Sequence, residues 1–315
     1  MIQTTNLTKT FGPFMAVDHL NLEIYPGETY GFLGPNGAGK TTTLMMILGI
    51  LKPTEGEVHV LGEPVSSRSF SIKRHLGVVA EYQSFYDEMT AWEYLMFFSK
   101  LFEVEEPEKR IQELMGRIQL WKWRNVLLGG YSTGMKRKLG FVRALLHSPE
   151  VLILDEPVSG LDPFGVVQIR EVLIEEHKAG KTILISSHIL SEVERTADRV
   201  GIIAQGRLLV EDSMVNLRQK VGGYRRIELQ ALHPSEKLVQ EIHTLPFVDR
   251  IDQENDLMVI YTHDDADYRA DLGRFLTSQG VVVQGMRALE TTLEEAFITI
   301  TEAHIRDWTG SQYGD

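Results

Sequence analysis

The chain has 315 residues and no cysteine, and 43% of its residues are hydrophobic against 24% that are charged. This composition is ordinary for a globular protein. The absence of cysteine excludes disulfides and thiolate metal sites, and the net charge of −12 argues against a general nucleic-acid-binding surface. No secretory signal is visible at the N-terminus, and the apolar run at 44–51 is too short to cross a membrane.

The first 33 residues predict three strands, at 2–10, 20–25 and 30–33. Between the first two strands stand Phe11 and Phe14. An aromatic ring at this point can stack on a purine base, but a ring in the hydrophobic core is the simpler explanation. The residue pattern alone leaves both alternatives open.

A glycine-rich stretch, GPNGAGKTT at 34–42, follows the third strand and leads into a predicted helix at 43–51. Strand, glycine-rich loop and helix in this order are typical of a phosphate-binding loop, because backbone N–H groups and the positive helix end face the phosphate oxygens. Lys40 is then in reach of the β- and γ-phosphates, and Thr41 offers its hydroxyl to Mg²⁺. A glycine-rich turn that matches by chance is the alternative.

Residues 53–57 predict a turn, and strands are expected at 58–61 and 76–80. A loop at 81–90 is rich in aromatic and acidic residues. The helical pattern at 90–123 then predicts an all-helical insertion within an α/β frame.

A turn of small residues at 131–135 runs into a predicted helix whose first turn carries Lys136, Arg137 and Lys138. Positive charge at a helix N-terminus opposes the helix dipole. The conflict hints at a nearby anion or a functional surface.

The apolar run at 151–154 ends in Asp155 and Glu156, and a second strand at 182–186 leads to His188. The carboxyl end of a parallel sheet is where an active site is expected. Adjacent residues on a strand point in opposite directions, so the two acids can take different roles. Two exposed loop acids are the alternative for this pair. Other elements expected in this part are a turn at 159–163, a helix at 164–179, and strands at 200–203 and 207–210.

Residues 220–315 differ in composition, with nine Lys and Arg against 17 Asp and Glu. The acidic shift fits a separate module, although a solvated acidic face is the simpler explanation. No catalytic constellation is visible there. The expected elements are strands at 225–231, 247–252, 257–261 and 281–287, and helices at 235–244, 265–279 and 292–302.

In this order, the motifs resemble the nucleotide-binding subunit of an ATP-binding cassette (ABC) transporter over roughly residues 1–215. The resemblance implies an α/β P-loop NTPase cassette with a mixed sheet at 1–219, with a helical subdomain inserted at about 88–148. It also implies a small C-terminal α+β domain at 220–315. The matching motifs are Walker A at 34–42, the signature at 131–135, Walker B at 151–156, the D-loop at 159–162, the switch histidine His188 and the adenine-stacking position Phe11.

The motifs depart from the family pattern in three respects. The signature has Thr133 and Met135 where Gly and Gln are usual, and the Q-loop glutamine position falls on Glu81, two residues before Gln83. Val158 replaces the Thr common after Glu-Pro. The first two departures resemble bacterial exporters of the ABC-2 type, which often carry a small C-terminal domain.

The resemblance implies ATP and Mg²⁺ as ligands and assigns the site by residue. The implied catalytic residues are Lys40, Glu156 and His188, and the implied metal-binding residues are Thr41, Glu81 and Asp155. Residues implied to contact the nucleotide are Phe11, Gly34, Pro35, Asn36, Gly37, Ala38, Gly39, Lys40, Thr41, Thr42, Ser132, Gly134 and Asp162.

The family mechanism also implies partners. Two cassettes pair head to tail as a homodimer, and a separate transmembrane permease contacts the groove around 81–89, so the chain is expected at the cytoplasmic face of the membrane without nucleic acid. One alternative is a cassette protein acting in translation or DNA maintenance. Against it stand the single copy of each motif and the short separation of Lys40 from Ser132. The other alternative, a non-catalytic ATP binder, conflicts with the intact catalytic positions.

Overall fold

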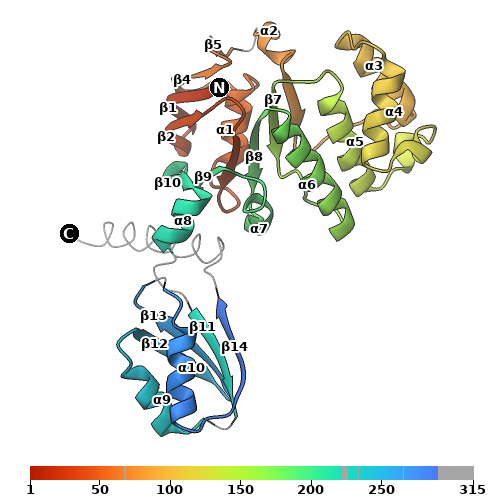
Figure 1. Ribbon diagram of the computed structural model, residues 1–315. Helices are drawn as coiled ribbons and strands as arrows, with labels where there is room; N and C mark the ends of the chain where they lie inside the picture. Colours follow the sequence, from red (N-terminus) through yellow and green to blue (C-terminus); the bar gives the residue numbers. More distant parts are fainter. Residues whose placement is uncertain (67–68, 222–225, 233, 265, 290–315) are drawn as a thin grey trace. The chain divides into compact units, whose positions relative to one another are not determined.

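A computed structural model describes residues 1–66, 69–221, 226–232, 234–264 and 266–289. The chain divides into two compact units, Met1–Ser213 and Met214–Asp315 (Figure 1). The predicted boundary, between residues 219 and 220, falls inside helix α8 (Met214–Val221). Among the described residues, no helix is both long enough and apolar enough to span a membrane.

An antiparallel sheet forms one layer of the first unit, in the order β2-β1-β4-β5. Its strands are β1 (Ile2–Phe11), β2 (Phe14–Ile24), β4 (Glu55–Val60) and β5 (Glu63–Pro64). Leu20, Leu22 and Ile24 are buried as their alternation predicts. Strand β2 begins six residues earlier than expected, because its first residue pairs with Phe11 across a tight hairpin.

A six-stranded sheet forms the second layer, in the order β10-β9-β3-β8-β7-β6. Its strands are β3 (Thr29–Leu33), β6 (Leu76–Val79), β7 (Val151–Asp155), β8 (Thr182–Ser187), β9 (Arg199–Ala204) and β10 (Arg207–Ser213). All neighbours are parallel except β9 and β10. Every residue of β3, β7 and β8 is buried, as expected for parallel strands covered on both faces. The parallel strands therefore end at one common edge.

Helix α1 (Lys40–Ile47) lies between the two layers. Its Leu44, Met46 and Ile47 share one hydrophobic cluster with residues of both sheets. The helix begins three residues before the predicted position and ends four residues earlier. It ends there because Gly49 takes the left-handed conformation that often terminates helices. The other helices that accompany the parallel sheet are α2 (Phe70–Lys73), α6 (Pro163–Lys178) and α7 (Leu190–Val193).

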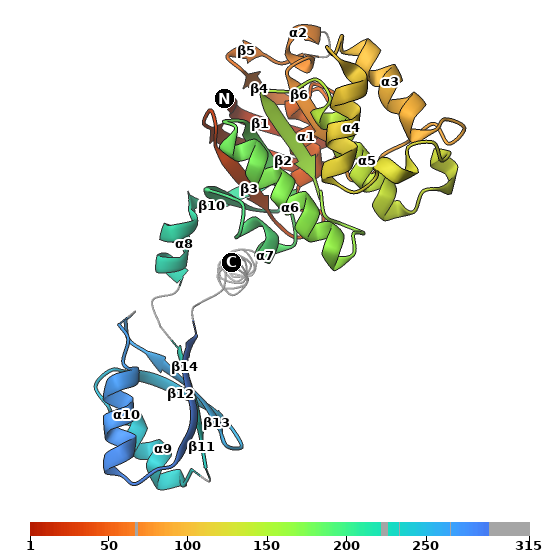
Figure 2. The same cartoon turned by 45° about the vertical axis from the view of Figure 1, so that its right-hand side comes forward.

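The predicted helical insertion consists of several short helices rather than one continuous pattern (Figure 2). A capping box formed by Thr90 and Glu93 starts the first helix. That helix stops before Glu103 and Glu106, both at positive φ, and Pro107 starts the next one. The elements are α3 (Ala91–Leu101), α4 (Pro107–Arg117), the 3₁₀ turns η1 (Trp121–Trp123) and η2 (Leu128–Gly130), and α5 (Thr133–Leu145).

The second unit carries a β-α-β-β-α-β arrangement after α8. Its elements are β11 (Arg226–Ala231), α9 (Glu236–His243), β12 (Val248–Glu254), β13 (Leu257–Thr262), α10 (Arg269–Ser278) and β14 (Val283–Leu289). The sheet order is β12-β13-β11-β14, with every pair antiparallel, as in ferredoxin-like folds. Both helices cover the same face, where Leu238 and Leu272 join the buried strand residues. The helix predicted at 292–302 lies outside the described residues.

Candidate functional site

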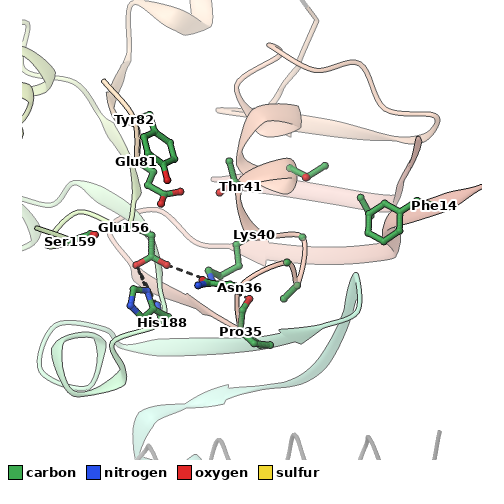
Figure 3. Close-up of a pocket in the computed structure, with 15 residues that line it drawn as sticks. Phe14, Pro35, Asn36, Lys40, Thr41, Glu81, Tyr82, Glu156, Ser159 and His188 are labelled. Carbon is green, nitrogen blue, oxygen red and sulfur yellow. Dashed lines mark hydrogen bonds and ion pairs between the residues drawn. The ribbon is translucent and has the colours of Figure 1, made fainter. Parts of the chain in front are cut away.

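A cavity of about 600 Å³ lies where the phosphate-binding loop (residues 34–42) meets the carboxyl ends of β7 and β8 (Figure 3). The loop after β6 and the first residues of β2 close its walls. The cavity is lined by Phe14, Ala16, Pro35, Asn36, Gly37, Ala38, Gly39, Lys40, Thr41, Thr42, Glu81, Tyr82, Glu156, Ser159 and His188.

The conformation of the phosphate-binding loop requires glycine at its end. Gly39 precedes the first residue of α1 and has φ of 105°. A residue with a side chain would be strained in this left-handed conformation, whereas glycine adopts it readily. A Cβ at Gly39 would also lie 2.5 Å from the carbonyl oxygen of Ala16. The loop can therefore turn tightly into α1, whose first residue, Lys40, lines the cavity.

Lys40 is the cation at the centre of the site. Its side chain is only 6% exposed, and its Nζ donates to the carbonyl oxygens of Gly34 at 2.6 Å and Pro35 at 3.3 Å. The same Nζ lies 3.5 Å from Oε1 of Glu156. Burial strengthens this electrostatic pairing, because water is largely excluded from it.

Asp155 is held between the loop and the neighbouring strand. The Thr41 hydroxyl donates to Oδ2 of Asp155 at 2.8 Å, and the Ser186 hydroxyl donates to its Oδ1. Asp155 and Glu156 are each 5% exposed, so the alternative of two exposed loop acids is wrong. Ser186, the last residue but one of β8, was not predicted as a site residue.

Glu156 adopts an unusual backbone conformation, with φ of 47°. Left-handed backbone at a residue with a side chain costs roughly 1–2 kcal/mol and tends to occur at functional sites. The Oε2 of Glu156 lies 2.8 Å from Nδ1 of His188, whose side chain is 48% exposed. The carboxylate therefore bridges a lysine and a histidine at the mouth of the cavity (Figure 3).

The oxygen atoms beside Lys40 suit a magnesium ion that also binds phosphate. Mg²⁺ prefers oxygen ligands and is usually held by one or two carboxylates together with phosphates and water. Thr41 and Asp155 already converge, and Glu81 lines the same cavity. Within the described residues there is no cluster of three or more His, Asp or Glu side chains that would hold a metal alone. The residues fit Mg²⁺ that arrives with a nucleotide.

The loop after β6 separates the two candidates for its functional residue. Glu81 lines the cavity, whereas the Oε1 of Gln83 accepts a hydrogen bond at 3.1 Å from Arg143 on α5. Arg143 also donates to the Tyr94 hydroxyl at 2.8 Å. Gln83 is thus part of the packing between this loop and the helical subdomain, and it is not among the residues that line the main cavity.

The two phenylalanines of the first hairpin are both on the surface, with Phe11 49% and Phe14 61% exposed. The core alternative is therefore wrong for both. Phe14, which the sequence analysis did not choose, lines the cavity, and Phe11 is not among the lining residues. The Nζ of Lys9 lies 5.1 Å from the centroid of the Phe11 ring.

The signature residues do not reach the main cavity within one chain. Ser132 caps α5 by accepting a hydrogen bond from the Met135 N–H at 3.2 Å, and Gly134 lies in the first turn of the same helix. Asp162 caps α6 in the same way, through the Gly165 N–H at 2.8 Å. A second cavity of about 390 Å³ lies between this region and the loop after β6, lined by Glu81, Tyr82, Gln83, Ser84, Phe85, Thr133, Lys136, Arg137, Ser159 and Gly160.

The three basic residues in the first turns of α5 all have partners within the chain. Lys136 pairs with Asp87 at 2.7 Å, and Lys138 donates to Gln168 at 2.6 Å. Arg137 is 9% exposed and donates to the Ala80 carbonyl at 2.9 Å. Burial lowers the pKa of the Arg137 guanidinium, and the nearby carboxylates counteract part of this effect. These partners compensate for the unfavourable position of the charges at the helix N-terminus.

A family model described as "ABC transporter" matches residues 17–159. The bacitracin transport ATP-binding protein BcrA of Bacillus licheniformis is 37% identical over 307 residues, covering 95% of this chain and 97% of that protein. The chain belongs to the ATP-binding subunits of ABC transporters. The Nod factor export ATP-binding protein I of Sinorhizobium fredii is 35% identical and covers 97% of this chain and 87% of its own length.

Solved structures of ABC cassettes share the fold of the first unit. A dimeric ATP-binding cassette in a post-hydrolysis state, bound to ADP and Pi, superposes with a TM-score of 0.63 and 26% identity, covering 68% of this chain and 99% of that chain. An ATP-binding subunit of an ABC transporter gives a TM-score of 0.66 at 28% identity. The predicted α/β P-loop cassette is confirmed, and this ABC subunit binds and hydrolyses ATP to power transport.

Proposed function

We propose that this ABC subunit binds Mg-ATP in the 600 Å³ cavity and uses Glu156 to activate the attacking water. The observation that carries the proposal is the cluster of Lys40, Glu156 and His188 beside the Thr41–Asp155 pair. Lys40 binds the β- and γ-phosphates, and the loop N–H groups together with the α1 N-terminus stabilise their negative charge. His188 orients the Glu156 carboxylate and contacts the γ-phosphate.

In this proposal Thr41 and Asp155 would hold a magnesium ion, and Glu81, which lines the same cavity, would add a third oxygen group. When bound, Mg²⁺ neutralises the negative charge that develops on the phosphate oxygens. The existing hydrogen bond from Thr41 to Asp155 keeps both oxygen groups directed to one point before the metal arrives. A charged Glu81 in place of a neutral glutamine adds to the attraction for the metal.

The nucleobase binds at the hairpin formed by β1 and β2, where exposed aromatic rings allow stacking. Phe14 lines the cavity at this end, and its pairing partner Phe11 stands beside it. Ser132, Gly134 and Asp162 serve the second cassette of a head-to-tail homodimer. This arrangement is supported by their position outside the cavity of their own chain and by the dimeric cassette of similar fold.

A separate membrane permease completes the transporter, and we infer that transport is export. The relatives named for bacitracin transport and Nod factor export match over nearly the full chain. The permease contacts the loop at 81–89 and the helical subdomain, and the ABC subunit lies at the cytoplasmic face of the membrane. Packing of Gln83 against Arg143 supports a mechanical connection between the nucleotide site and this docking region.

The proposal is tested by the variant Glu156→Gln. We expect ATP binding to persist, because the phosphate-binding loop and Lys40 are unchanged, while hydrolysis slows by about 10²–10⁴-fold, the usual contribution of a positioned general base. Binding is measured with a fluorescent ATP analogue and turnover by phosphate release.

Glu150→Gln is the matched control, because Glu150 precedes the opposite end of the same strand and its side chain is 62% exposed. Its turnover should equal that of the unmodified protein. A loss of less than about fivefold in Glu156→Gln would show that another group activates the water.

A further inference from the structure

Ser186 is a buried hydroxyl that joins the two carboxylate residues of the proposed site. The residue is 0% exposed and lies near the carboxyl end of β8. In the parallel pairing of β7 and β8, its Cα is the register partner of Asp155. This register places the Ser186 side chain beside Asp155 and its backbone beside the start of the next residue, Glu156.

The contacts of Ser186 divide between the two acids. Its hydroxyl donates to Oδ1 of Asp155, while Thr41 donates to Oδ2 from the opposite side. The backbone N–H of Glu156 donates to the Ser186 carbonyl oxygen at 3.1 Å and lies 3.3 Å from the Ser186 Oγ. One serine therefore fixes the carboxylate plane of Asp155 and anchors the backbone of Glu156.

The two contacts of Ser186 restrain the Asp155 carboxylate and the Glu156 backbone. A carboxylate with a donor on each oxygen cannot rotate freely, so Asp155 keeps an orientation that leaves its remaining lone pairs for a metal. Glu156 has left-handed backbone, which persists only when surrounding contacts hold it. Loss of the Ser186 hydroxyl removes one of these contacts from each acid.

The neighbouring Ser187 makes no hydrogen bond to the two acids among the described residues, so these contacts are specific to position 186. Ser187 is 1% exposed, almost as buried as Ser186. Its hydroxyl accepts from the Ile189 N–H at 2.9 Å, a local turn contact on the other side of the strand. No hydrogen bond within the described part of the chain joins Ser187 to Asp155 or Glu156.

We propose that Ser186 is a positioning residue that orients Asp155 toward magnesium and holds Glu156 in place for hydrolysis. The inference rests on the proposed function, because it assigns Ser186 a role through the metal-binding and water-activating carboxylates. Groups that orient a metal ligand from behind typically change metal affinity by 10–100-fold when they are removed.

The test compares Ser186→Ala with Ser187→Ala in the full-length protein. For Ser186→Ala we expect the Mg²⁺ concentration that gives half-maximal ATP hydrolysis to rise at least about tenfold. The turnover number at saturating Mg²⁺ should fall, with little change in the KM for ATP. Binding of a fluorescent ATP analogue without Mg²⁺ should stay within about twofold of the unmodified protein, because the phosphate-binding loop is untouched. Ser187→Ala should leave the Mg²⁺ midpoint, the turnover number, the KM for ATP and the binding of the analogue unchanged.

Ser186→Cys distinguishes positioning from packing, since a thiol fills the space of the hydroxyl but is a weak donor. We expect it to behave like Ser186→Ala, and it carries the test if the alanine variant does not fold. A normal Mg²⁺ midpoint in Ser186→Cys, or equal midpoints in the two alanine variants, would overturn the inference.

Asp155→Asn in the same assay separates this inference from the proposed site. If Asp155→Asn raises the Mg²⁺ midpoint and Ser186→Ala does not, the role of Ser186 fails while the proposed metal site stands. If Asp155→Asn leaves the midpoint unchanged, the metal site itself is wrong, and the role of Ser186 falls with it.

Discussion

At the scale of single residues, the site contains charged side chains whose burial would be unfavourable without a partner. Lys40, Asp155 and Glu156 are nearly fully buried, although charged groups in proteins are seldom buried without partners. Each of them has a partner here: Glu156 lies near Lys40 and His188, and Asp155 accepts from two hydroxyls. The charges are thus oriented before a nucleotide binds, which is the condition for strong electrostatic stabilisation of a reaction.

The aromatic rings of the first hairpin lead to a prediction about nucleobase binding. Phe14 faces the cavity, whereas Phe11 does not line it and lies under the ammonium of Lys9. We expect Phe14→Ala to weaken binding of an ATP analogue by about fivefold to 100-fold, in line with the roughly 1–3 kcal/mol that stacking of a base on an aromatic ring contributes. Equilibrium titration with the fluorescent analogue measures the effect.

Met15→Ala is the control for this prediction, because Met15 is similarly exposed but points to the other side of the same strand. Phe11→Ala is measured in parallel. If Phe11→Ala alone weakens binding, the stacking position is the one that the family resemblance indicated, and the expectation for Phe14 is wrong.

Sequence reasoning located the loop, the two acids and the histidine because each follows a strand or glycine pattern that is local in the chain. It could not locate Ser186, whose importance arises from the register between β7 and β8. The choice between Phe11 and Phe14 likewise depends on where the hairpin lies against the phosphate-binding loop. Contacts between segments far apart in sequence leave no periodic signal.

At the scale of elements, a charged contact fastens the helical subdomain to the sheet-bearing core. Arg117 at the end of α4 donates to Glu176 at 2.8 Å and to Glu175 at 2.6 Å, both on α6. Lys181 also pairs with Glu176, at 2.9 Å. The Glu176 side chain is 8% exposed, so this contact is better shielded from water than an ordinary surface pair.

We therefore expect Arg117→Met to lower the free energy of unfolding by about 2 kcal/mol, less than the 3–5 kcal/mol of a fully buried pair because Arg117 is partly exposed. The measurement is urea denaturation followed by circular dichroism. Arg74→Met is the control: the Arg74–Glu103 pair is 64% and 71% exposed, and such pairs contribute about 0–1 kcal/mol. Equal losses in the two variants would contradict a special role for the α4–α6 contact.

The same contact has a defined pH dependence. Burial raises the pKa of Glu176, but hydrogen bonds and charges from Lys181 and Arg117 outweigh it, so the pKa lies below its ordinary value. A lowered pKa in the folded state stabilises the protein above the unfolded-state pKa, which is about 4.3. This stabilisation is lost as the pH falls through the folded-state value. The difference in the free energy of unfolding between Arg117→Met and the unmodified protein should therefore become smaller below about pH 4.

Element boundaries were predicted well where burial alternates and less well where a turn decides them. The α1 helix starts at Lys40 because the loop itself turns into the helix, while the apolar pattern from which it was predicted begins later. The region 90–123 was predicted as one helical insertion, and the structure separates α3 from α4 at the left-handed residues Glu103 and Glu106, just before Pro107. Such conformations are uncommon for residues with side chains and are difficult to expect from sequence.

At the scale of the whole molecule, the proposed nucleotide site is divided between two regions of the chain that do not meet within one copy. Lys40 and Glu156 line the main cavity, while Ser132 caps α5 outside it. In a two-fold symmetric dimer, each site would receive the loop of one chain and the signature of the other. Because both proposed halves are present in one chain, we expect a homodimer with two equivalent sites.

This arrangement predicts that two inactive variants restore each other. Lys40→Ala and Ser132→Ala homodimers each carry a defect in both sites. In a mixed dimer both defects fall in one site, and the other site is intact. Random pairing of equal amounts makes about half of the dimers mixed, so about a quarter of the sites should be restored if the sites act independently. The measurement is ATP hydrolysis by each variant alone and after mixing, with the permease present if the cassettes alone are silent.

Dimer formation in the mixture has to be measured separately, because the variants must exchange subunits before any site can be restored. Fluorescence energy transfer between differently labelled variants provides this measurement, and single cysteines can be introduced as labelling sites without competition, since the chain has none of its own. Mixing Lys40→Ala with Glu156→Gln is the matched control: both residues belong to the same half-site, so every site in a mixed dimer keeps one defect and activity should not return. If dimers of Lys40→Ala and Ser132→Ala form and hydrolysis stays at the level of the separate variants, independent sites shared between two chains are excluded.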